Sequence, residues 1–62
     1  MEIGQSIQEA RKKAKLTQKE LAEKVGIATI TVQQYERGVR TPKIETLQKI
    51  AQALNIDVGV LY

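Results

Sequence analysis

The sequence contains no cysteine, no histidine and only one proline, Pro42. Disulfide bonds and zinc ligation are therefore excluded as sources of stability. A chain of 62 residues buries only about 60% of the surface that its unfolded form exposes, so its stability is marginal. We expect one domain over residues 1–62, held together by helix packing and helped by oligomerisation.

Long apolar runs are absent as well. No stretch approaches the roughly 18 residues of a membrane span, and the N-terminus lacks the apolar core of a signal peptide. We therefore expect a cytoplasmic protein without a membrane partner. With no histidine or cysteine and no converging pair of carboxylates, the sequence offers no nucleophile, general base or metal site. We expect no enzymatic activity, no metal or other cofactor, and no small-molecule substrate.

The chain does contain 42% apolar residues and carries a net charge of +3. The apolar content is enough for a core. The charge is compatible with nucleic-acid binding but is weak evidence by itself. The basic residues form an early cluster of Arg11, Lys12, Lys13 and Lys15 and a middle cluster of Arg37, Arg40 and Lys43.

Apolar residues recur every three to four positions from Ile3 onward, which predicts an amphipathic first helix ending near Lys15. Thr17 and Glu20 have the spacing of a capping box, so a second helix begins at about Gln18. Gly26 ends that helix, because glycine adopts positive φ without steric cost. The residues predicted to face the core from these two helices are Ile3, Ile7, Ala10, Ala14, Leu21, Ala22 and Val25.

A third helix is predicted from about Ala28 to Arg37, ended by Gly38. The β-branched run over residues 29–32 favours a strand when taken alone. However, Ile27, Val32 and Tyr35 fit one helical face better than an alternating pattern.

After a loop over residues 39–43, a fourth helix carries an apolar stripe, and Asn55 suits the left-handed conformation at its end. Asp57 can cap a short last helix from Val58 to Leu61. The stripe consists of Ile44, Leu47, Ile50, Ala51 and Leu54. The sequence thus predicts an all-α fold, a compact five-helix bundle.

Residues 18–37, flanked by Thr17 and Gly38, have the features of a helix-turn-helix. Two helices can cross at roughly 90–120° over a short turn only under tight steric conditions. Ala22 supplies a small side chain where the helices approach, and Gly26 supplies the turn. Val32 is then expected at the crossing. The alternative is an ordinary corner between two helices of a small bundle.

Three stretches resemble the Cro/repressor-type (XRE-like) helix-turn-helix family, which includes the lambdoid phage repressors. They are LTQKELAEKVG over residues 16–26, QQYERG over 33–38 and TPKIETLQKIAQAL over 41–54. The resemblance implies a lambda repressor-like DNA-binding domain, of prokaryotic or phage origin, whose third helix enters the major groove of double-stranded DNA. It also implies a sequence-specific transcriptional repressor that binds a palindromic operator as a homodimer.

The resemblance further implies an ion pair between Arg11 and Glu36. The residues themselves point the same way, because Arg11 shares a helical face with Ile7 and Ala14. A buried charge is costly unless it is paired, so each of the two residues needs a partner. The alternative is two solvated surface charges.

Candidate base-reading residues lie on the third helix, opposite Val32 and Tyr35. Glutamine can bond adenine through two atoms, threonine can bond several bases, and an aliphatic side chain can pack on a thymine methyl group. An exposed isoleucine has no evident structural benefit unless it packs locally, which is the alternative here. The predicted base-reading residues are Thr29, Ile30, Gln33 and Gln34.

Contacts to the DNA backbone are expected from the start of the second helix and from the loop after the third. The amides and the dipole of a helix N-terminus suit a phosphate, and the resemblance makes Gln18 the phosphate ligand there. The predicted backbone-contact residues are Thr17, Gln18, Arg37, Arg40, Thr41 and Lys43. We interpret Lys12, Lys13 and Lys15 as a solvated face.

Four residues depart from the family pattern. Ile30 stands where polar residues dominate, which leaves the operator sequence open. Lys15 stands where glycine is common, so a positive φ there would carry strain. Ala28 and Lys43 stand where serine or threonine caps are frequent, so the third and fourth helices are expected to start less firmly.

Two other readings stay open at this point: an antitoxin or protein-interaction module with the same fold, and a fragment of a larger repressor. The apolar residues at the end of the chain are expected to be part core and part dimer surface. They are Val58, Val60, Leu61 and Tyr62.

Overall fold

The computed structural model describes residues 3–62, and over that range it contains helices and no strands. The elements in chain order are α1 (Ile3–Lys13), α2 (Gln18–Val25), α3 (Thr29–Arg37), α4 (Ile44–Ala53) and the 3₁₀-helix η1 (Val58–Leu61). The all-α prediction is confirmed, with a 3₁₀-helix as the fifth element. No helix in the described range is long and apolar enough to cross a membrane.

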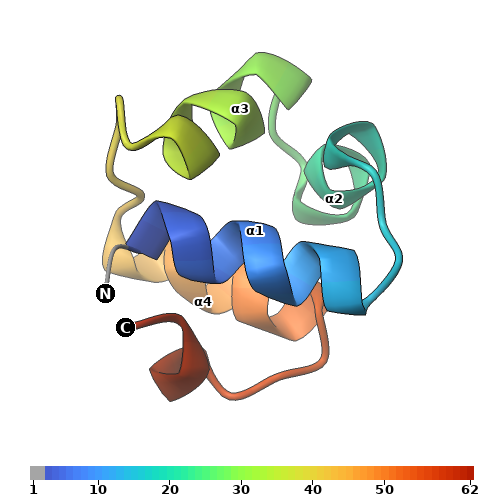
Figure 1. Cartoon of the computed structure of the whole chain (residues 1–62), viewed down its shortest axis with the longest axis vertical. Coiled ribbons are helices and arrows are strands. Elements are labelled where there is room, and N and C mark those ends of the chain that lie inside the picture. Colours follow the sequence, from blue (N-terminus) through green and yellow to red (C-terminus); the bar gives the residue numbers. More distant parts are fainter. Residues whose placement is uncertain (1–2) are drawn as a thin grey trace.

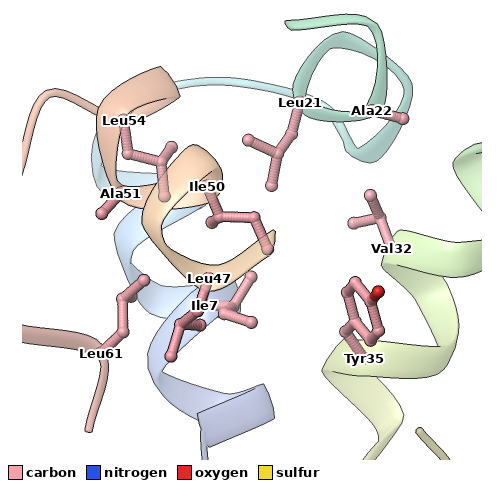
Figure 2. Close-up of a cluster of buried hydrophobic side chains, with 10 residues drawn as sticks. All are labelled: Ile7, Leu21, Ala22, Val32, Tyr35, Leu47, Ile50, Ala51, Leu54 and Leu61. Carbon is pink, nitrogen blue, oxygen red and sulfur yellow. The ribbon is translucent and has the colours of Figure 1, made fainter. Parts of the chain in front are cut away.

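The helices surround one core (Figure 1). α3 packs against both α1 and α2, while η1 packs against α1 and α4. Every element contributes to the cluster of buried side chains in Figure 2. Its members are Ile7 from α1, Leu21 and Ala22 from α2, Val32 and Tyr35 from α3, Leu47, Ile50 and Ala51 from α4, Leu54 just after it, and Leu61 from η1. The buried side chains of α2 and α3 therefore anchor the helix-turn-helix to the core formed with α1, α4 and η1.

The N-terminus of α2 has the predicted capping box. The backbone N–H of Glu20 donates to Thr17 Oγ1 at 3.0 Å, and the backbone N–H of Thr17 donates to Glu20 Oε1 at 2.8 Å. The backbone hydrogen bond from Thr17 lowers the pKa of the Glu20 carboxyl below its ordinary value, because it favours the ionised form. These bonds fix the residue at which α2 begins.

Positive φ values mark the ends of four helices. Gly26 (φ 85°) and Gly38 (φ 78°) end α2 and α3, as predicted. Asn55 (φ 58°) follows α4, and Lys15 (φ 59°) lies in the turn after α1. Lys15 therefore adopts the conformation that its family position implied, with the strain of a side chain in the left-handed region.

Two apolar residues lie outside the core, contrary to prediction. Ala14 is exposed because α1 ends at Lys13, two residues before the predicted end, and the chain turns away there. Ile44 is 60% exposed because it is the first residue of α4 and precedes the part of the helix that the core covers. Helical periodicity places a residue on a face but does not show where the neighbouring elements stop.

Close approach between α1 and α3 depends on Gly4. A Cβ atom at this position would lie 2.2 Å from the backbone oxygen of Tyr35 and 3.0 Å from that of Glu36. Neither carbonyl can move without displacing α3. Gly4 therefore sets the distance between α1 and the last turns of α3.

Gly4→Ala is expected to lower the free energy of unfolding by about 1–3 kcal/mol, the usual cost of overpacking. The sign is diagnostic, because the same change at an unhindered helical site stabilises by about 1 kcal/mol. Urea denaturation measures it. Gly59→Ala is the matched control, since its Cβ would meet only Asp57 Oδ1 at 4.0 Å. A Gly4→Ala variant as stable as the parent would contradict the close approach.

Candidate nucleic-acid interface

The turn between α2 and α3 brings the two helices together at a small side chain. Ala22 and Val32 are 1% and 0% exposed. The backbone oxygen of Ala22 accepts from the N–H of Gly26 at 2.8 Å and from that of Ile27 at 3.0 Å, which closes the end of α2. The geometry is that of a helix-turn-helix, as the sequence predicted.

α3 has two different faces. Val32 and Tyr35 on its inner face are buried. Ile30 on the outer face is 57% exposed, which argues against the reading in which it only packs locally. Thr29, Gln33 and Gln34 are half-buried. All four predicted base-reading residues therefore belong to a single nine-residue helix.

Arg11 and Glu36 form the predicted ion pair. Arg11 Nε donates to Glu36 Oε2 at 2.6 Å and Arg11 Nη2 donates to Glu36 Oε1 at 3.2 Å. The side chains are 10% and 2% exposed, so the reading as two solvated charges is wrong. A third guanidinium donor, Nη1, reaches the backbone oxygen of Leu16 at 2.8 Å. The pair therefore joins the end of α1, the turn after it and the end of α3.

Gln18 extends this network to the start of α2. Its Nε2 donates to Glu36 Oε1 at 3.0 Å. One N–H of the side-chain amide is thereby held, while the other stays free to donate. The sequence suggested Gln18 only as a phosphate ligand. The bond to Glu36 was missed because the two residues are 18 positions apart and no local pattern joins them.

The predicted backbone-contact residues occupy two regions. Thr17 and Gln18 lie at the start of α2, where the Thr17 hydroxyl is already used in the capping box. The other four are exposed near the end of α3 and the start of α4, and none forms an ion pair within residues 3–62. They are Arg37, Arg40, Thr41 and Lys43. Lys12, Lys13 and Lys15 are exposed, consistent with a solvated face.

No group of three or more acidic, histidine or cysteine side chains that could hold a metal ion occurs within the described residues.

These features define a helix-turn-helix protein, and a family model described as helix-turn-helix matches residues 7–61. The chain belongs to this family. It is 41% identical over 61 residues to the HTH-type transcriptional regulator ImmR of Bacillus subtilis, covering 98% of this chain and 48% of that protein. The chain thus spans about half the length of the curated relatives it matches.

Solved structures agree with this assignment. The DNA-binding domain of the P22 c2 repressor has a TM-score of 0.94 and 31% identity, covering 98% of this chain and 80% of that one. The biofilm regulator SinR, solved in complex with DNA, has a TM-score of 0.89 and 38% identity, covering 95% of each chain. The fold is that of the lambda-type repressor domains.

Glu36→Gln is expected to lower the free energy of unfolding by about 3 kcal/mol, because Arg11 would keep its buried charge without a carboxylate partner. Arg11→Met should cost a similar amount, and the double variant should cost clearly less than the sum of the two. Urea denaturation of all three variants measures the coupling. Glu23→Gln, at an exposed site on α2, is the control and should change stability by less than about 0.5 kcal/mol. Strictly additive losses would rule out the coupling.

Proposed function

We propose that the chain binds double-stranded DNA sequence-specifically and regulates transcription as a repressor, with α3 in the major groove. The observation that carries the proposal is the exposed outer face of α3, where Ile30 projects from a helix whose opposite face is fixed in the core. The structural likeness to SinR, whose solved structure includes DNA, supports it.

Each residue of this face has a role that its chemistry permits. Gln33 and Gln34 can accept from adenine N6 and donate to N7, and Thr29 can bond either kind of group. Ile30 can pack against the C5-methyl group of thymine. This is a binding role, and we propose no catalysis for the chain.

Backbone contacts would position this face. Gln18 retains a free amide N–H beside the start of α2, and the four exposed residues around the α3–α4 loop bring three positive charges. Phosphate contacts of this kind fix the register on the duplex and make binding depend on salt.

We further propose that two copies bind a palindromic operator. Val60 and Tyr62 are 56% and 54% exposed, whereas Leu61 between them is fully buried, so the end of the chain presents apolar surface beside the core. An isologous contact would cover that surface. A cytoplasmic location in a prokaryotic cell, where the DNA is accessible, goes with this proposal.

Selection from random duplexes followed by binding at several salt concentrations tests the function. The selected site should be palindromic, with half-sites about 34 Å apart. It should bind at least about 10³-fold more tightly than random DNA, with a steep negative slope of log affinity against log salt. A flat slope without selectivity would contradict DNA binding and favour a protein-interaction module.

Ile30→Ala and Gln34→Ala are expected to weaken binding to the selected site by about 1–3 kcal/mol each and to relax the preference at one base pair. Affinity for random DNA should hardly change, because its source is the phosphates. Gln52→Ala, at an exposed position on α4, is the matched control. An unchanged ratio of specific to random affinity in both variants would remove these residues from the reading face.

A further inference from the structure

A groove of about 510 Å³ lies between α1, the end of α4 and η1. Its charged lining residues are Glu9 and Lys13 of α1, and no described residue of α2 or α3 lines it. In Figure 1, α1 lies between α3 and η1, so the groove faces away from the outer face of α3. The apolar lining residues are Ala10, Ala14, Leu54, Ile56 and Val60.

The apolar lining of this groove is only partly covered by the chain itself. Ala14 and Val60 are exposed, and Ile56 is half-buried. Single exposed apolar residues are ordinary, but these three line one hollow together. Ala10 and Ala14 also keep the α1 side of the groove low, so that the backbone of another molecule can approach closely. Covering this surface would remove apolar area from water, which is favourable.

The two charges of the groove have no ionic partner. Glu9 and Lys13 are exposed and lie one helical turn apart, a spacing at which opposite charges commonly pair. Neither forms an ion pair within residues 3–62. Glu9 Oε2 accepts from Gln5 Nε2 at 3.4 Å, which is long for a hydrogen bond. Both charges are therefore available to a molecule that enters the groove.

A second copy of the chain carries the complementary charges at the required spacing. Consider a two-fold axis perpendicular to α1 that passes midway between Glu9 and Lys13. The two α1 helices then run antiparallel, and Glu9 of each copy faces Lys13 of the other. A two-fold axis along the helices would instead place like charges against each other, which is repulsive. The charge pattern therefore selects the antiparallel arrangement.

We propose that the groove binds a second copy of the chain through antiparallel contact between the two α1 helices. The apolar lining of each copy is covered by the other, and two pairs of Glu9 with Lys13 fix the direction. The contact involves part of one helix and one short segment, and exposed ion pairs contribute little energy. Association of free copies is therefore weak, as is usual for small interfaces.

This contact differs from the operator dimer, because the groove faces away from α3. The outer faces of the two α3 helices point away from each other, so the pair cannot occupy both half-sites of one operator. It joins copies bound to separate stretches of DNA, and this second part rests on the proposed function. DNA-bound copies meet at a raised effective concentration, at which a weak contact is sufficient. Tyr62 is not a lining residue and stays exposed for the operator dimer.

The test reverses the two charges singly and together, in Glu9→Lys, Lys13→Glu and the double variant. Glu23→Lys and Lys49→Glu, at exposed positions on α2 and α4, are the matched controls for net charge. Amide NMR signals of the groove residues are followed with increasing protein concentration at low salt. The same titration is made with an equimolar mixture of the two single variants. The melting temperature of each variant shows that it is folded.

The wild-type signals should shift with concentration, and the controls should behave alike. Each single reversal should weaken self-association about tenfold, because two attractive contacts become two repulsive ones. The double variant and the mixture should both return to within about twofold of the wild-type affinity, since each restores opposite charges at both contacts. Single variants that associate as the wild type does, or a mixture that stays dissociated, would overturn the antiparallel contact. Wild-type signals that do not depend on concentration would overturn the second copy as the occupant.

A separate measurement tests the joining of DNA. Two differently labelled copies of the selected duplex are mixed with each protein, and energy transfer between the labels is recorded. Transfer should appear with the wild type and the double variant and be lost with either single variant. A wild type that binds both duplexes without transfer would overturn the joining of DNA. A wild type that selects no duplex, while the groove contact still follows the charge reversals, would instead defeat the proposed function.

Discussion

The hydrogen-bonded pair of Arg11 and Glu36 is the constraint on which the arrangement of the first three helices depends. At 10% and 2% exposure, neither side chain can be satisfied by water, so the chain must bring α1, the turn after it and α3 into one geometry. The remaining Arg11 donor holds the Leu16 carbonyl, and Gln18 completes the set at the start of α2. The position of α3, which the proposed function needs, is thereby set by polar contacts at one end and by Val32 and Tyr35 in the core.

The N-termini of the last four elements differ in whether a side chain caps them. α2 satisfies its first amides with Thr17 and Glu20, and η1 uses Asp57. α3 and α4 have no such acceptor. A helix start without a side-chain cap lowers the stability of a small domain. A serine or threonine in place of Ala28 or Lys43 would therefore make the domain more stable. The start of α4 directly follows the basic loop.

Local chemistry explains what the sequence could predict. The capping box, the glycines after α2 and α3, and Asn55 each act within a few residues, so their positions gave helix ends within about two residues. That Arg11 needs a partner was predictable because it shares a helical face with Ile7, whereas its pairing with Glu36 was implied by the family resemblance. The exposure of Ala14 and Ile44 and the close approach at Gly4 depend on contacts across the fold, which no local pattern records. Gly4 lies in helical register with Ile7 and Arg11, and this spacing was a signal from which the close approach of α1 and α3 could have been predicted. The roles of the outer face of α3 remain predictions.

The central claim is that the outer face of α3 meets DNA. Backbone amide shifts of the chain, recorded with and without the selected duplex, test it most directly. The account predicts the largest changes along α3 from Thr29 to Gln34, at the start of α2 and in the loop before α4, with little change around Glu9 on α1. Changes confined to α1 and η1, with the signals of α3 unmoved, would contradict it.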